Sequence, residues 1–168
     1  MIKYIVAGSR SYKHTGKSFE RLSECIRNSR VYIEEDNWCK PADLTIVSGD
    51  CHGPDRMGAK WARENDIEVE VYPADWDRHG KAAGMIRNAE MADVGDALIC
   101  FWDGESRGTK NMIQEMINRY KSVICHLFDE DCLITRTLTI NWGVDSYGYP
   151  TIIDEITGEI IQLDKLGS

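Results

Sequence analysis

The sequence predicts an α/β fold, with a doubly wound parallel sheet followed by a C-terminal antiparallel β appendage. Short, nearly continuous apolar runs alternate with segments of helical spacing, as in parallel sheets that are covered on both faces. A length of 168 residues suits one domain with a full core. After Cys132 the pattern changes to a strict two-residue alternation, which is typical of antiparallel strands.

Five apolar runs are expected to form the parallel strands of the sheet. Several are almost unbroken in Val, Ile and Leu, and each is followed by small or polar residues. The runs are IKYIVAG (2–8), DLTIVSG (43–49), IEVEVYPA (67–74), DALICFW (96–102) and SVICHLF (122–128).

Four segments between these runs are expected to form helices, namely 17–29, 54–65, 81–92 and 108–120. Apolar residues recur in them three and four positions apart, and Pro54 suits a first helical position. The third helix is expected to pack on the sheet through a stripe made of Ala82, Met85, Ile86, Ala89 and Ala92. The charged region 30–42 is interpreted as an insertion or a weak edge element.

The organisation predicted is a ligand-binding domain over 1–132, with 133–168 as a β-hairpin extension of the same domain. The stretch ITRTLTINW (134–142) alternates two faces, and TIIDEITGEIIQL (151–163) is interpreted as two strands around a turn near Thr157 and Gly158. This appendage either extends the sheet edge or buries an apolar face in a partner subunit. A homo-oligomer is expected.

Composition limits the function classes. A net charge of −8 and a pI near 5.0 disfavour a protein that coats nucleic acid, because such binding relies on a basic surface. No apolar run reaches the ~18–20 residues of a membrane span, and no signal-peptide pattern is present. The six cysteines lack metal-ligand spacing, as do His52 and His79. We therefore expect a cytoplasmic protein with reduced thiols, no metal and no cofactor.

Candidate binding residues follow the predicted strands, because ligands of doubly wound sheets lie outside the carboxyl ends of the strands. Three strand ends place small residues and hydroxyls at a helix entry, where free N–H groups and the helix dipole favour an anion. Arginine adds forked donors that suit phosphate. The predicted ligand-binding residues are Gly8, Ser9, Arg10, Ser48, Gly49, Gly53, Asp55, Trp76, Arg87, Asn88, Ser106, Gly108 and Thr109.

Each candidate also has a purely structural interpretation. The hydroxyls suit helix caps, and Asp55 suits the charge of a helix N-terminus. Trp76 either stacks on a base or ribose or fills the edge of the core. Arg87 and Asn88 either contact phosphate and ribose or base groups, or belong to a polar helix surface.

Four motifs together resemble one known family. VAGSRSY (6–12), IVSGDCHGPDRMGAKWA (46–62), YPADWDRHGKAAGMIRNAEM (72–91) and DALICFWDGESRGTKNMI (96–113) look like the YspA/YpsA-related branch of the SLOG superfamily. The resemblance covers about residues 1–126. It implies a Rossmann-like sheet whose strand-end loops bind nucleotides or nucleotide-derived metabolites. Superfamily relatives include phosphoribohydrolases, DNA-processing protein A and sensors of ADP-ribose-like signals, and genes of this branch are common in phages and mobile elements.

The chain departs from this pattern at two places. Phosphoribohydrolases carry a PGGxGTxxE loop with an assisting glutamate, whereas Asn111 and Met112 stand at the corresponding place here. Asp50 stands where the branch tends to have a second glycine.

Two functions therefore stay open. The first is binding of an AMP- or ADP-ribose-like ligand by a sensor or sequestering protein. The alternative is a nucleoside-phosphate N-glycosidase with Asp75, Asp77 or Glu90 as catalytic carboxylate.

Overall fold

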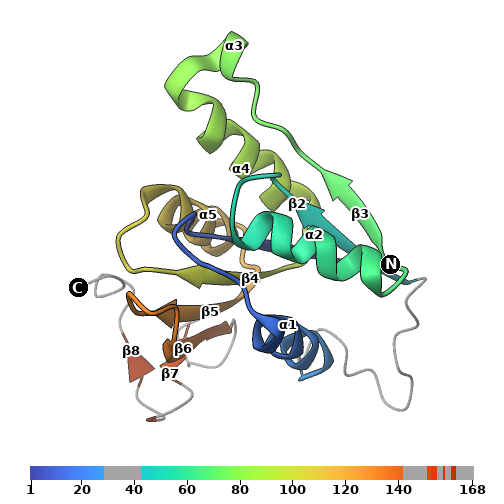
Figure 1. Ribbon diagram of the computed structural model, residues 1–168. Coiled ribbons are helices and arrows are strands. Elements are labelled where there is room, and N and C mark those ends of the chain that lie inside the picture. The colour runs from blue at the N-terminus through green and yellow to red at the C-terminus, as the bar shows by residue number, and fades with distance from the viewer. Residues whose placement is uncertain (29–42, 142–150, 155–156, 158–159, 162–168) are drawn as a thin grey trace.

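The computed structural model describes residues 1–28, 43–141, 151–154, 157 and 160–161. The expected insertion at 30–42 lies outside these residues. The described strands form one eight-stranded sheet in the order β3-β2-β1-β4-β5-β6-β7-β8. Strands β1 to β5 pair in parallel, and β6, β7 and β8 continue the sheet in antiparallel pairs (Figure 1). The predicted Rossmann-like class with an antiparallel appendage is confirmed.

The elements follow the predicted alternation closely. The parallel strands are β1 (Ile2–Gly8), β2 (Leu44–Ser48), β3 (Glu68–Val71), β4 (Ala97–Trp102) and β5 (Ser122–Phe128). The helices are α1 (Gly16–Asn28), α2 (Pro54–Glu64), α3 (Trp76–His79), α4 (Ala83–Val94) and α5 (Arg107–Asn118), with a 3-10 turn at Gly80–Ala82 before α4. The appendage consists of β6 (Ile134–Asn141), β7 (Thr151–Asp154) and β8 (Ile160–Ile161).

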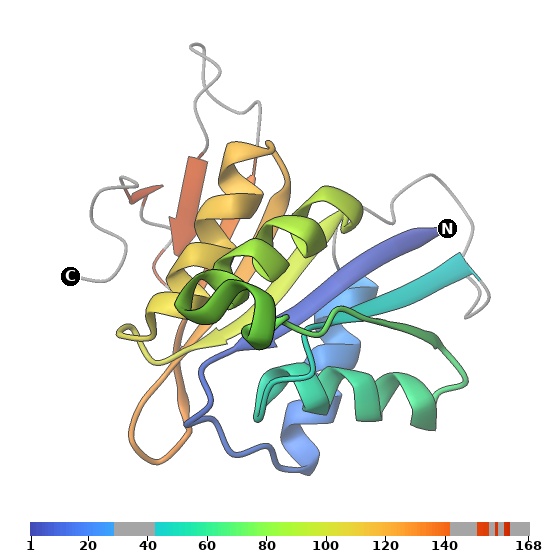
Figure 2. The same ribbon diagram turned by 90° about the horizontal axis from the view of Figure 1, so that it is seen from above.

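Alternate residues of β1 point into two separate cores. Tyr4 and Val6 pack with residues of α1 and α2, whereas Ile5 and Ala7 pack with residues of α4 and α5. The first two helices therefore cover one face of the sheet, and α4 and α5 cover the other (Figures 1 and 2). The chain winds outward from β1 to β3 and then returns to β4 on the opposite side of β1. The carboxyl ends of β1 and β4 are thus the switch point at which such sheets bind ligands.

The appendage extends the sheet. Strand β6 pairs along β5, and Leu138, Ile140 and Ile152 are buried in the same core as Val123 of β5. Of the two interpretations of this segment, extension of the sheet edge is the one observed. Among the described helices, none combines the length and the apolar character needed to span a bilayer.

The prediction that the apolar stripe of α4 packs on the sheet is wrong for the first half of the helix. Met85 is 58% exposed and Ile86 37% exposed, whereas Arg87 and Asn88 are buried. The reason is position: the N-terminal half of α4 projects beyond the strand ends (Figure 1), so its inner side faces the space between the loops rather than the sheet. Only near its end, at Met91 and Ala92, does α4 join the apolar core.

The end of β1 requires glycine. A Cβ at Gly8 would press on the carbonyl of Phe101 in β4 and lie 2.7 Å from Cγ of Pro54 at the start of α2. We expect Gly8→Ala to lower the free energy of unfolding by about 1–3 kcal/mol, because a backbone carbonyl cannot yield to the new methyl group. Urea unfolding curves measure this change. Gly16→Ala is the matched control, since a Cβ there meets nothing within 4 Å; equal loss in both variants would contradict the packing described.

Candidate functional site

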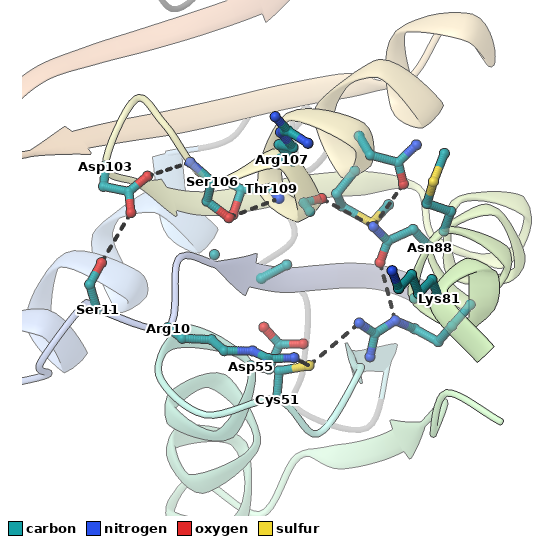
Figure 3. Close-up of a pocket in the computed structure, with 18 of the residues that line it drawn as sticks. Arg10, Ser11, Cys51, Asp55, Lys81, Asn88, Asp103, Ser106, Arg107 and Thr109 are labelled. Carbon is teal, nitrogen blue, oxygen red and sulfur yellow. Dashed lines mark hydrogen bonds between the residues drawn. The ribbon is translucent and has the colours of Figure 1, made fainter. Parts of the chain in front are cut away.

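A cavity of about 750 Å³ lies at the switch point, outside the carboxyl ends of β1 and β4 (Figure 3). Its wall comes from the loops after β1, β2 and β4, from the first half of α4 and from the start of α5. A second hollow of about 240 Å³ shares Arg10, Cys51, Trp76 and Arg87 with the cavity. Segments far apart in the sequence therefore meet around one space.

The loop after β1 is tied to the loop after β4. The backbone N–H of Ser9 donates to the carbonyl of Phe101 at 2.9 Å, and the Ser9 hydroxyl accepts from the N–H of Asp103 at 3.1 Å. Ser9 is buried and does not line the cavity, but it fixes the next residue, Arg10, whose side chain does.

The loop after β2 is shaped by its own hydrogen bonds. The Ser48 hydroxyl donates to the carbonyl of Asp55 at 3.0 Å and accepts from the N–H of Asp50 at 3.2 Å. Asp50 has a φ of 55° and Gly53 a φ of 88°, both in the region that favours glycine. The backbone at position 50 thus has the left-handed conformation that favours glycine, and aspartate is one of the residues that adopt this conformation most readily.

Because Gly49 has no side chain, two groups of opposite charge, the Arg87 guanidinium and the Asp55 carboxyl, pack close to its backbone. A Cβ at this position would lie 2.5 Å from Cζ of Arg87 and 2.7 Å from Oδ2 of Asp55. Burial of the Asp55 carboxyl raises its pKa to about 6, although the charge of Arg87 and the backbone N–H of Cys51 oppose this rise. Asp55 is therefore a buried carboxyl that helps to hold Arg87, rather than an exposed acid at a helix end.

Arg87 and Asn88 connect the loop after β2 with helix α5. Arg87 donates from Nη1 to the carbonyl of Gly49, from Nη2 to Sγ of Cys51 at 3.5 Å and from Nε to Oδ1 of Asn88 at 3.1 Å. Asn88 in turn donates to the carbonyl of Gly108 at 3.1 Å and to Oδ1 of Asn111 at 2.9 Å (Figure 3). The pair is a structural bridge across the floor of the cavity.

The start of α5 leaves donors for an anion. Ser106 caps the helix by accepting from the backbone N–H and the hydroxyl of Thr109. Within the described chain, the N–H groups of Arg107 and Gly108 have no hydrogen-bond acceptor, as is usual for a first helical turn. Both residues line the cavity, and a Cβ at Gly108 would meet nothing within 4 Å.

Asp103 is the accessible carboxylate of the cavity. It accepts from the N–H groups of Ser106 at 2.8 Å and Glu105 at 3.0 Å, and from the Ser11 hydroxyl at 3.1 Å (Figure 3). Partial burial raises the pKa of Asp103, but these hydrogen bonds outweigh burial and the pKa lies below its ordinary value. The carboxylate is therefore ionised and held in one orientation.

Three cations face the same space. Arg10, Lys81 and Arg107 line the cavity with exposed side chains, and none forms an ion pair with another residue that the structure describes. In a chain with a net charge of −8, such a group creates a local positive potential. The arrangement suits an anionic ligand.

Most of the predicted binding residues meet at the cavity. Those that line it are Gly8, Arg10, Asp55, Trp76, Arg87, Asn88, Ser106, Gly108 and Thr109. The other four residues do not line it. Ser9 and Ser48 form hydrogen bonds within the loops, Gly53 precedes α2, and Gly49 lines the smaller hollow.

The three predicted catalytic carboxylates do not line the cavity. Asp75 caps α3 by accepting from the N–H of Arg78 at 3.0 Å. Asp77 and Glu90 are exposed, and Arg87 points inward rather than pairing with Glu90. Sequence spacing alone could not show on which side of α3 and α4 these groups lie.

Several residues that line the cavity were not predicted from the sequence. Asp103 follows the run DALICFW directly, so its place at a strand end was a usable signal. Lys81 and Met85 also line the cavity, but they were hidden by the assumption that the apolar side of α4 faces the sheet. Cys51 and Ser11 carried no distinguishing pattern.

Trp76 stands at the outer edge of the cavity. It is 51% exposed, so the interpretation as a core-filling residue is wrong. A Cβ at Gly84 would lie 3.4 Å from its ring, and Met85 also lines the cavity and is exposed. The edge is thus apolar while the floor is polar.

Comparison with known proteins gives two matches. The model of the YspA, cpYpsA-related SLOG family matches residues 3–79, from β1 to the end of α3. The Gene 61 protein of Mycobacterium phage D29 is 31% identical over 121 residues, which cover 68% of this chain and 88% of that protein. No solved structure matches the chain.

The buried Asp55 predicts a specific pH dependence of stability. Its pKa is about 6 in the folded protein and 3.8 when unfolded, so the folded state holds the proton more tightly. The contribution of Asp55 to stability is therefore full below pH 3.8 and is lost as the pH rises to about 6, by about 3 kcal/mol in total.

Asp55→Asn removes this titration. We expect the variant to be least stable relative to the wild type near pH 4 and to approach it towards pH 7, as measured by urea unfolding across this range. Asp77→Asn, at an exposed position, is the control and should show no such trend. A stability difference for Asp55→Asn that is constant with pH would refute the assignment.

Proposed function

The chain belongs to the YspA, cpYpsA-related SLOG family, and from this we propose that it binds a nucleotide or nucleotide-derived metabolite of the AMP or ADP-ribose type, as a sensor or sequestering protein. One observation carries the proposal: one cavity at the β1/β4 switch point is lined by three cations that form no ion pair with a described residue, and by two N–H groups of α5 that have no acceptor in the described chain. Its volume of about 750 Å³ suits a ligand of this size.

The phosphate is assigned to Arg10 and to the start of α5. Arg10 and Arg107 have guanidinium groups that no described carboxylate neutralises, and Gly108 leaves room for a phosphate oxygen to approach the backbone. Arg10 makes one long contact, from Nη2 to Sγ of Cys51 at 4.0 Å, whereas Arg87 already donates to Gly49, Cys51 and Asn88. Its role in the proposal is to hold the wall in place, with its remaining donors available to the ligand.

The rest of a nucleoside fits the remaining wall. The Asp103 carboxylate is ionised and accepts from Ser11, so it offers acceptor oxygens for ribose hydroxyls. The half-exposed ring of Trp76, with Met85 beside the same opening, offers an apolar face on which a base stacks.

Binding is favoured over bond cleavage because the carboxyl groups that reach the cavity are already engaged in holding its wall. Among the described residues, only Asp55 and Asp103 bring a carboxyl group to the cavity. Asp55 is buried against Gly49 and Arg87, and Asp103 is held by the turn that begins α5. Asn111, near the place of the hydrolase glutamate, accepts a hydrogen bond from Asn88 and thus serves the bridge.

Calorimetric titration with AMP and ADP-ribose tests the proposal. We expect saturable binding to the wild type, with Arg10→Ala and Arg107→Ala each raising Kd by about 10- to 100-fold through loss of a charge-assisted hydrogen bond. Arg63→Ala on α2 removes an exposed arginine that does not line the cavity and should leave Kd unchanged.

No heat of binding for either ligand at millimolar concentration would refute the proposal. Chromatography of the same mixtures after long incubation separates binding from cleavage. The proposal expects intact ligand, whereas release of free base that Asp103→Asn abolishes would establish the glycosidase instead.

A further inference from the structure

The carboxyl group of Asp55 occupies a place that suits the anion of a ligand. Asp55 is buried in the first turn of α2 and lines the cavity. Backbone N–H groups at the end of β1 and in the loop after β2 donate to its carboxylate, namely those of Gly8, Gly49 and Cys51. Clusters of backbone N–H groups at strand ends commonly hold a phosphate. The chain therefore fills this set of donors with a carboxylate of its own.

The charged side chains that line the cavity do not balance one another. With both carboxylates ionised, four cations face two carboxylates, so the cavity has an excess of two positive charges. The excess would be three if Asp55 carried no charge. The charged residues are Arg10, Lys81, Arg87, Arg107, Asp55 and Asp103.

Asp55 offsets the charge of Arg87 in particular. The two groups lie on the backbone of Gly49, where a Cβ would be 2.5 Å from Cζ of Arg87 and 2.7 Å from Oδ2 of Asp55. Burial raises the pKa of Asp55, and the charge of Arg87 opposes this rise, so the two charges attract one another. The buried guanidinium is thus neutralised from within the protein, and the exposed cations are left to attract a ligand.

We propose that Asp55 sets the charge of the ligand, so that the cavity prefers nucleotides with about two negative charges over nucleoside di- and triphosphates. The inference rests on the proposed function, because it concerns which nucleotides the same cavity accepts. The second pKa of a phosphate monoester is about 6, so at pH 7.5 AMP carries about two charges, ADP about three and ATP about four. ADP-ribose carries about two, because both of its phosphates are esterified.

An additional phosphate meets two obstacles at this wall. The strand-end N–H groups that would hold it already donate to Asp55. The carboxylate itself repels a further negative charge in the same cavity, where repulsion is stronger than in water. Both obstacles come from one side chain, so one substitution reports on them.

Calorimetric titration with AMP, ADP-ribose, ADP and ATP in metal-free buffer at pH 7.5 tests the inference. For the wild type we expect a Kd for ADP at least about 10-fold above that for AMP, and a weaker affinity still for ATP. Asp55→Asn keeps the shape of the side chain without its charge and should bring ADP within about 3-fold of AMP. Asp77→Asn, at an exposed position that does not line the cavity, should keep the wild-type ratio. Circular dichroism confirms that each variant is folded.

A lower pH removes the same charge without a substitution. The pKa of Asp55 is about 6, so at pH 5 most of its carboxyl is protonated and the ratio of the Kd values for ADP and AMP should fall. The terminal phosphates of AMP and ADP titrate in the same range, so their own protonation largely cancels in this ratio. The other groups near Asp55 are Arg87 of α4 and the Cys51 thiol, with Arg10 and Asp103 in the same cavity. The arginines keep their charge, and Asp103 stays ionised because its pKa lies below the ordinary value.

The results for binding and for selectivity are separate. If none of the four nucleotides binds, the proposed function fails and this inference fails with it. If AMP or ADP-ribose binds but ADP binds equally well, or if Asp55→Asn keeps the wild-type ratio, the inference is overturned while the proposed function stands. A fall of the ratio at pH 5 that persists in Asp55→Asn belongs to another group, such as His52 in the smaller hollow, and overturns it as well.

Discussion

The guanidinium of Arg87 occupies a space that exists because residue 49 has no side chain, and from there it reaches Asn88 and the loop after β2. Asn88 continues the contact to α5. A buried cation with few carboxylates nearby is costly unless its donors are satisfied, and carbonyl, amide and sulfur groups do this here together with the charge of Asp55. This bridge holds the loop after β2, helix α4 and the start of α5 in fixed positions relative to one another.

The position of α4 explains two features that look unrelated. Because the first half of the helix stands beyond the strand ends, its inner side borders the cavity and must be polar (Figure 1). Its apolar residue Ile86 is then left exposed on the outside, and Met85, which is also exposed, lies at the edge of the cavity.

The sequence predicted the fold class and the meeting of the strand ends, because both follow from local apolar patterns and the rules of parallel sheets. It did not predict which side of α4 is buried, because periodicity locates a stripe but not what the stripe faces. For the same reason Glu90 was a catalytic candidate, although it lies on the outer side of α4. Asp103 was missed although it follows β4 directly.

Hydrogen–deuterium exchange of the wild type and Asn88→Ala measures the central claim most directly, namely that one buried bridge joins the strand-end segments into a single site. We predict faster exchange in Asn88→Ala at the start of α5 and in the loop 49–53, which are remote from residue 88 in the sequence, with α1 unchanged. A change confined to α4 would mean that the loops hold their positions independently, and it would contradict the account.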